Sequence, residues 1–178
     1  MNLALIGYRG TGKSHVARLL AGKLGWPLVD ADIYVEQQAG KSIAEIFAEA
    51  GEAGFRDLES KALVQLTQHT RHILSLGGGV ILREENRQQI ADRCFTVWLT
   101  ASPEEIARRL SGDQTTQARR PSLTGKSTLD EIEEVLTVRM PLYQQCADLT
   151  IDTQSKSPQQ VAQAIVDQLP SSLVKKVP

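Results

Sequence analysis

The chain has 178 residues, of which 41% are hydrophobic and 23% charged, a balance typical of one globular domain. A formal net charge of -1 gives no global basic field that would argue for binding nucleic acid, so no nucleic-acid partner is expected. No apolar run reaches about 18 residues and no cationic region precedes a long apolar N-terminal segment, so neither a membrane span nor a secretory signal is expected. Cys94 and Cys146 show no metal-ligand or disulfide pattern, which favours a cytoplasmic protein.

Short apolar runs alternate with longer helical patterns in the first half of the chain. Residues 3–7 (LALIG) predict a buried strand, and the apolar spacing that follows predicts a helix over 13–24. Residues 27–32 (PLVDAD) predict a second strand. Helical spacing then continues over 33–50, and a further helix is expected from about 55 to 68.

The second half continues the same alternation. Strands are predicted at 72–79, 94–100 and 148–153, and helices from about 103, over 129–145 and from 158. A polar segment, 111–127, separates two of these helices, and Pro141 is expected to disturb the second of them. We expect one domain over 1–170, with the tail 171–178 frayed.

Repeated strand–helix alternation predicts an α/β fold, a three-layer α/β/α arrangement with five parallel strands. In such sheets, ligands bind beyond the carboxyl ends of the strands. Those ends carry the glycine-rich segment 7–14, the pair Asp30 and Asp32, and the run 77–79 (GGG). The sequence therefore predicts one site at this edge of the sheet.

The first of these segments fits the motif G-x-x-x-x-G-K-S/T at Gly7, Gly12, Lys13 and Ser14, between a strand and a helix. Glycines let backbone N–H groups and a helix N-terminus approach phosphate oxygens. Lys13 would contact the β- and γ-phosphates, and the Ser14 hydroxyl would bind Mg²⁺. The alternative is a glycine-rich turn with no ligand, which the context makes a weak competitor.

The other two segments each allow two interpretations. Asp30 could hold a Mg²⁺-bound water while Asp32 orients a substrate hydroxyl and accepts its proton, or either residue could simply cap the next helix. The run 77–79 could offer backbone N–H groups to a ligand, or form a tight turn with no ligand.

The arginines are ambiguous on residues alone. Arg56 could form an exposed ion pair with Glu59, which composition favours, or act as a guanidinium clamp for an anionic substrate. The segment 111–127, with Arg119 and Arg120, could be a solvated loop or an arginine-bearing lid that closes over phosphates. The position of Arg139 does not tell whether it faces solvent or the site.

Together these motifs resemble the shikimate kinase family, small P-loop phosphotransferases of the nucleoside-monophosphate-kinase type. The segments GYRGTGKS, DAD, FRDLE, LGGG, RRP and VRMPLY occur in the family's order over roughly 2–168. The P-loop alone would not single out this family, but the combination of DAD, FRxxE and GGG is much more specific. The resemblance implies a P-loop kinase fold and ATP-dependent phosphorylation of the 3-hydroxyl of shikimate, with Mg²⁺, by a cytoplasmic monomer.

The resemblance also implies roles on the nucleotide side. The ATP phosphates would be bound by Gly10, Thr11, Gly12, Lys13, Ser14 and His15. Mg²⁺ would be bound by Ser14, with Asp30 acting through water. Arg120 matches the lid arginine that contacts ATP and the transferring phosphate. Adenine would lie against Arg109 or Arg108, near Ser157 and Pro158.

On the acceptor side, the resemblance implies that shikimate is bound by Asp32, Arg56, Gly78, Gly79 and Arg139. The two arginines would take its carboxylate, and Asp32 would help deprotonate the attacking hydroxyl. Catalysis would rest on Lys13, Asp32 and Arg120. The chain departs from the family pattern at His15, where a threonine is common, and in the lid, which reads RRPSL.

Two other functions are compatible with the P-loop. A kinase with another acceptor, such as gluconate, would keep the P-loop and lid but need not share the paired arginines with DAD and GGG. A non-catalytic binding module would be expected to lack Lys13, Asp32 or Arg120, and this chain has all three. A nucleotide-dependent switch is disfavoured because there is no guanine-reading N-K-x-D motif.

Overall fold

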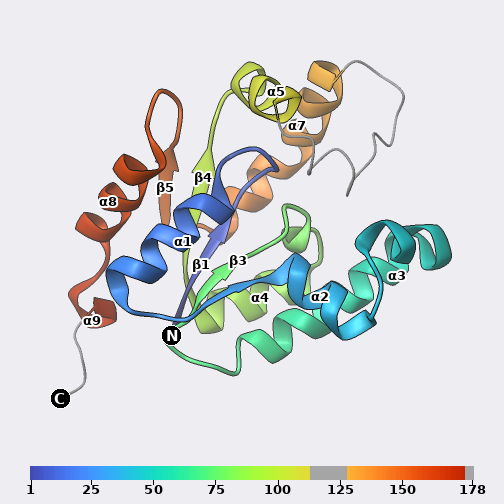
Figure 1. Ribbon diagram of the computed structural model, residues 1–178, viewed down its shortest axis with the longest axis horizontal. Helices are drawn as coiled ribbons and strands as arrows, with labels where there is room; N and C mark the ends of the chain where they lie inside the picture. Colours follow the sequence, from blue (N-terminus) through green and yellow to red (C-terminus); the bar gives the residue numbers. More distant parts are fainter. Residues whose placement is uncertain (113–127, 175–178) are drawn as a thin grey trace.

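The computed structural model describes residues 1–112 and 128–174. Within these residues five strands form one sheet, in the order β2-β3-β1-β4-β5, and every neighbouring pair is parallel (Figure 1). The strands are β1 Asn2–Ile6, β2 Leu28–Asp30, β3 Ile73–Ser75, β4 Cys94–Thr100 and β5 Leu149–Asp152. The predicted parallel five-stranded sheet is therefore confirmed.

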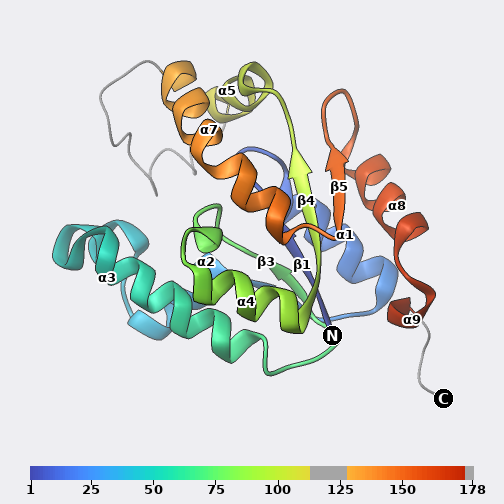
Figure 2. The ribbon, with the colours of Figure 1, turned by 180° about the vertical axis from the view of Figure 1, so that it is seen from behind.

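Helices cover both faces of the sheet, which confirms the predicted three layers (Figures 1 and 2). The described helices are α1 Lys13–Leu24, α2 Ala31–Ala39, α3 Ile43–Leu66, α4 Glu84–Arg93, α5 Pro103–Ser111, α7 Thr128–Cys146, α8 Pro158–Gln168 and α9 Ser171–Val174, with a 3₁₀ turn, η1, at Val80–Leu82. Helices α1 and α8 lie on one face, and α3, α4 and α7 lie on the other. None of the helices in the described ranges is long and apolar enough to cross a membrane.

Two apolar clusters hold the layers together. One joins the sheet to α1 and α8 through Leu5, Leu20, Trp26 and Ile165, all buried. The other joins the opposite face to α3, α4 and α7 through Leu63, Ile90, Trp98 and Tyr143. Burial of apolar area on both faces explains why the central strand β1 is apolar at nearly every position.

Helix α4 is absent from the sequence-based expectations. Its sequence, EENRQQIADR, contains one large apolar residue, Ile90, which is fully buried. One apolar residue in three turns gives no helical periodicity, so the helix could not be detected from hydrophobic spacing. Its position is fixed instead by tertiary contacts, including a hydrogen bond from Asn86 Nδ2 to the Val80 carbonyl at 2.9 Å.

Three other segments differ from expectation. The helical pattern expected over 33–50 is divided between α2 and the start of α3. Helix α3 then continues across a kink at Gly51, which has a φ of 66°, into the helix expected from about 55 to 68. Pro141 lies inside α7 and does not end it, because this exposed position lets water solvate the carbonyl that loses its partner. The tail expected to fray forms α9 at 171–174, where partly buried Leu173 packs on the α1–α8 cluster and donates its N–H to Pro170.

The carboxyl ends of the parallel strands meet along one edge. There β1 runs into residues 7–12, β2 ends at Asp30, and β3 leads to Gly77–Gly79. Strands β4 and β5 lead to α5 and to a loop beginning at Thr153. The segments that the sequence placed at one edge are therefore neighbours in the fold.

Candidate active site

The loop between β1 and α1 has the geometry of an anion cradle. Gly7 has a φ of 138°, and a Cβ there would collide with the Leu99 carbonyl, so the close approach requires glycine. Gly12, with a φ of 92°, is the N-cap of α1. Lys13 Nζ folds back and donates to the carbonyls of Gly7 at 2.8 Å and Tyr8 at 3.0 Å. A cation and a helix N-terminus thus share one loop, a combination suited to phosphate oxygens.

Asp30 caps α2, as one of the two interpretations predicted, and it also faces Ser14. Its Oδ1 accepts from the N–H groups of Asp32 at 3.1 Å and Ile33 at 3.4 Å, which caps α2. Its Oδ2 accepts from Ser14 Oγ at 3.3 Å, across from the loop. We expected Asp32 at the end of the second strand, but it lies in the first turn of α2. The reason is that the cap at Asp30 starts the helix at Ala31.

The Ser14–Asp30 pair suits Mg²⁺ because hydroxyl and carboxylate oxygens are its preferred donors. Among the residues that the structure describes, no group of three or more His, Cys, Asp or Glu side chains could hold a metal ion. A magnesium ion at Ser14 would therefore take its remaining ligands from water and phosphate, as is usual for this ion.

Arg56 is buried rather than exposed, with 8% of its surface accessible. Nη1 donates to Glu59 Oε2 at 2.7 Å, and Nη2 donates to Glu52 Oε1 at 3.0 Å. Burial alone would lower the pKa of Arg56, but the charge and hydrogen bonds of Glu59 and Glu52 outweigh it and raise the pKa. The prediction of an exposed ion pair, which composition favoured, is therefore wrong about exposure. Arg56 and Glu59 do form an ion pair, but Glu59 is only 4% accessible. The guanidinium of Arg56 is thus firmly held.

The glycine turn after β3 brings Arg56 and Arg139 together. A Cβ at Gly79 would collide with the guanidinium of Arg56, so that group lies directly against the turn. Arg139 Nη1 and Tyr143 Oη, both from α7, donate to the carbonyl of Gly78, the former at 3.2 Å.

The same turn also touches the phosphate-binding loop. A Cβ built at Gly78 would lie 3.1 Å from the Gly7 carbonyl. The two arginines therefore stand beside the cradle that carries Lys13.

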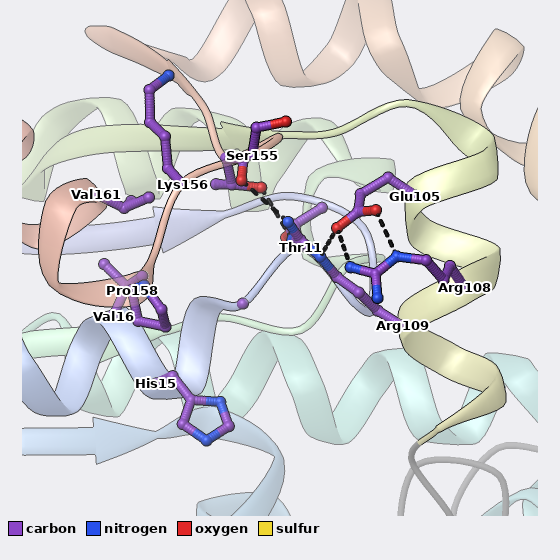
Figure 3. Close-up of a pocket in the computed structure, with 12 residues that line it drawn as sticks. Thr11, His15, Val16, Glu105, Arg108, Arg109, Ser155, Lys156, Pro158 and Val161 are labelled. Atoms are coloured by element: carbon purple, nitrogen blue, oxygen red, sulfur yellow. Dashed lines mark hydrogen bonds and ion pairs between the residues drawn. The ribbon is translucent and has the colours of Figure 1, made fainter.

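A cavity of about 300 Å³ opens between α1, α5 and the loop after β5 (Figure 3). Its lining includes Thr11, Gly12, His15, Arg108, Arg109 and Pro158. Ser157 is not among the lining residues; it caps α8 by accepting from the Gln160 N–H at 3.2 Å. Figure 3 shows the exposed His15 ring pointing away from the Glu105–Arg109 group.

Arg109 holds one wall of this cavity in place. Its Nη1 donates to the Gly10 carbonyl at 3.2 Å and to Thr153 Oγ1 at 3.0 Å, and Nη2 donates to the Thr153 carbonyl at 3.0 Å. Its Nε donates to Glu105 Oε1 at 2.7 Å. Hydrogen bonds from Arg108 and Arg109 lower the pKa of Glu105 to about 2.

Sequence reasoning missed Glu105, Thr153 and Tyr143 as members of the site. Thr153 is the last residue of the predicted strand 148–153, so its place at the carboxyl edge was an available signal. Glu105 and Tyr143 lie on helices and carry no such signal. Arg120 and the expected lid lie outside the described residues apart from Ser111 and Gly112, so the lid remains a prediction.

Comparison with known proteins agrees with this geometry. The family model described as shikimate kinase matches residues 9–170. The chain belongs to the shikimate kinase family. A shikimate kinase from Rhodopirellula baltica is 49% identical over 97% of this chain and 92% of its own, and one from Symbiobacterium thermophilum is 39% identical over 95% and 96%.

Among solved structures, shikimate kinase from Acinetobacter baumannii in complex with shikimate resembles this fold with a TM-score of 0.89. The two are 33% identical, and the match covers 98% of this chain and 95% of the other. The expected P-loop kinase fold is confirmed. Shikimate kinases are ATP-dependent transferases that act on a hydroxyl of shikimate, which fits a phosphate cradle beside two arginines.

Proposed function

We propose that this protein transfers the γ-phosphoryl group of ATP to the 3-hydroxyl of shikimate, giving shikimate 3-phosphate and ADP with the help of Mg²⁺. The observation that carries the proposal is the placement of Arg56 and Arg139 against Gly79 and Gly78, next to Gly7. An acceptor with a carboxylate would be fixed there, with its hydroxyl within reach of the phosphate cradle. We place the enzyme in the cytoplasm as a monomer; its two free, buried cysteines suit a reducing compartment.

On the donor side, the backbone of the loop from Gly10 to His15 binds the phosphates, and Lys13 contacts the β- and γ-phosphates. Its partners include two backbone carbonyls, neutral acceptors that an arriving phosphate would replace with a charged one. Ser14 would bind Mg²⁺ and Asp30 would hold a water of the ion, which would supply neutralisation of charge on the phosphates. Adenine would occupy the cavity lined by Arg109 and Pro158, next to Ser157, which directly precedes Pro158 in the chain.

On the acceptor side, Arg56 and Arg139 pair with the carboxylate, since the planar guanidinium matches two carboxylate oxygens. Gly78 and Gly79 allow the ring to approach the backbone closely. Asp32 orients the hydroxyl and accepts its proton as the bond to phosphorus forms. Arg120 would stabilise the charge that develops on the transferring group.

The proposal is tested by ADP release with shikimate, gluconate and nucleoside monophosphates offered separately. We expect ADP release with shikimate but not with the other two acceptors. A folded Lys13→Ala variant, used as the background control, should release none with shikimate either. Turnover with gluconate or a nucleoside monophosphate, and none with shikimate, would show that the proposed acceptor is wrong. No turnover with any of them, alongside measurable shikimate binding, would identify a binding module instead.

A further inference from the structure

The middle of the phosphate-binding loop is supported by two helices. Tyr8 is 4% accessible and packs in a small apolar cluster with Ile106 and Leu110 of α5 and Ile132 and Leu136 of α7. Gly10 lies against the same cluster, since a Cβ there would be 3.3 Å from Leu110. The backbone from Tyr8 to Gly10 is therefore held in place by α5 and α7.

Between these two residues, Arg9 points to α7. Its Nη2 donates to Glu131 Oε1 at 3.3 Å, and its guanidinium lies 5.7 Å from the centre of the Tyr8 ring. The Glu131 side chain is 7% accessible and that of Arg9 is 22% accessible. Arg9 occupies one of the variable positions of the G-x-x-x-x-G-K-S/T motif, so the motif does not require this contact.

Burial makes this ion pair different from an exposed one. A carboxylate with little access to water depends on the charges around it, so removing a cationic neighbour disturbs it more than an exposed group. Glu131 lies in the first turn of α7, so a change in its position would move the helix that packs on Tyr8. The Tyr8 carbonyl, in turn, accepts from Lys13 Nζ, which links the ion pair to the cation of the cradle.

We propose that Arg9 and Glu131 are a pair of positioning residues for the nucleotide. They act through the backbone from Tyr8 to Gly10, which they fix against α7 in the shape that receives the phosphates. Neither side chain needs to touch the nucleotide. The inference rests on the proposed function only in taking this loop as the nucleotide site.

A double-mutant cycle tests the pair, with Arg9→Met, Glu131→Gln and the two combined. The measurements are the dissociation constants of MgADP without shikimate and of shikimate without nucleotide, by calorimetry. We expect each single variant to weaken MgADP about three- to tenfold and the double variant to be no weaker than the worse single one, because contacting residues are coupled. Shikimate affinity should stay within about twofold, because Arg139, its proposed partner on α7, lies eight residues beyond Glu131 and is held separately by the Gly78 carbonyl, while the other proposed partners lie on other elements.

The matched control is the exposed ion pair of Lys41 and Glu49, which lies away from the loop. Lys41→Met and Glu49→Gln should leave both dissociation constants unchanged. Where Arg9→Met does not fold, Arg9→Lys serves in the cycle, because it keeps the charge and loses the guanidinium geometry. We then expect Arg9→Lys to bind MgADP more tightly than Glu131→Gln does, but less tightly than the wild type.

Three results would overturn the inference: unchanged MgADP affinity, fully additive losses, or equal losses for MgADP and shikimate, which would indicate general destabilisation. Since MgADP binding is measured without an acceptor, the cycle is independent of which acceptor the enzyme uses. A wild-type protein that binds MgADP but does not phosphorylate shikimate would contradict the proposed function alone.

Discussion

Arg56 and Arg139, far apart in the sequence, contact consecutive glycines of one turn. The guanidinium of Arg56 lies against Gly79, and Arg139 Nη1 donates to the Gly78 carbonyl at 3.2 Å. Arg56 is further fixed by Glu59 and Glu52, so its guanidinium is oriented before any ligand arrives. Two oriented guanidinium groups at one turn suit the carboxylate site that we propose, because little side-chain ordering would be needed on binding.

This arrangement predicts that each arginine contributes separately to shikimate binding. A hydrogen bond to a charged group contributes about 1.5–3 kcal/mol, so Arg139→Ala should weaken shikimate roughly ten- to a hundredfold. Arg56→Lys should recover little, because the charge returns without the planar geometry. The measurement is affinity for shikimate and for its neutral amide analogue. If both variants keep the full preference for the acid, the carboxylate is bound elsewhere.

The contact between Gly79 and Arg56 gives a second prediction. In Gly79→Ala the new Cβ would collide with a guanidinium that Glu59 and Glu52 hold in place. We expect shikimate affinity to fall at least about tenfold, the loss of one charged hydrogen bond, with MgADP affinity unchanged.

Gly22→Ala is the matched control for this substitution. Gly22 lies in α1, and a Cβ there meets nothing within 4 Å. Because alanine is the better helix former, this variant should keep shikimate affinity and gain about 0.5–1 kcal/mol in stability. Normal shikimate affinity in Gly79→Ala would mean that the position of Arg56 does not matter.

Substitution can separate the cap that Asp30 provides for α2 from the metal role that we propose for it. Asp30→Asn keeps an oxygen that caps α2 but loses the charge that faces Ser14. The Mg²⁺ concentration for half-maximal activity should rise about tenfold or more, with the melting temperature preserved. Asp30→Ala should raise it similarly and lower the melting temperature as well, because it also removes the cap. An unchanged Mg²⁺ requirement in both variants would exclude Asp30 from the metal site.

Asp32 is proposed to accept the proton of the attacking hydroxyl. Asp32→Asn has nearly the same shape but cannot act as a base, so kcat should fall about a hundredfold or more, the usual range for general base catalysis. The dissociation constant of ATP, measured separately, should not change. A rise in the KM for shikimate at constant kcat would show that Asp32 only positions the substrate.

Glu105 gives a prediction on pH. Its pKa falls from 4.5 to about 2 because Arg108 and Arg109 donate hydrogen bonds to it. A carboxyl group whose pKa is lower in the folded state stabilises the fold above its unfolded pKa, and this contribution disappears as the pH falls toward the folded pKa. Compared with Glu105→Gln, the wild type should be more stable near neutral pH, with the difference shrinking below about pH 5. Urea unfolding across this range would contradict the account if the difference did not depend on pH.

The sequence predicted those parts of the molecule that depend on local patterns. Strands such as β1 follow from short apolar runs, and the glycine loop follows from residues such as Gly7 and Gly12, whose positive φ values few other residues adopt. Their common edge follows from parallel topology alone. By contrast, α4 has a single large apolar residue, Ile90, and no periodic signal.

The site was less predictable where it depends on tertiary contacts. Nothing in FRDLE distinguishes a buried Arg56 from an exposed one, because Glu59 is spaced for a pair in either case. The contact of Arg56 with Gly79 depends on how α3 packs beside the turn, and that of Arg139 depends on α7 crossing behind it. Only the family resemblance brought these residues together in advance.

The most direct test of the central claim is the identity of the product. The wild-type protein, MgATP and shikimate are incubated together, and the product is examined by phosphorus–proton correlation NMR alongside quantification of ADP. The account predicts one new phosphate ester, coupled to the proton at carbon 3 of shikimate and formed in equal amount to ADP. A phosphate on another hydroxyl, or ADP released without phosphorylated shikimate, would contradict it.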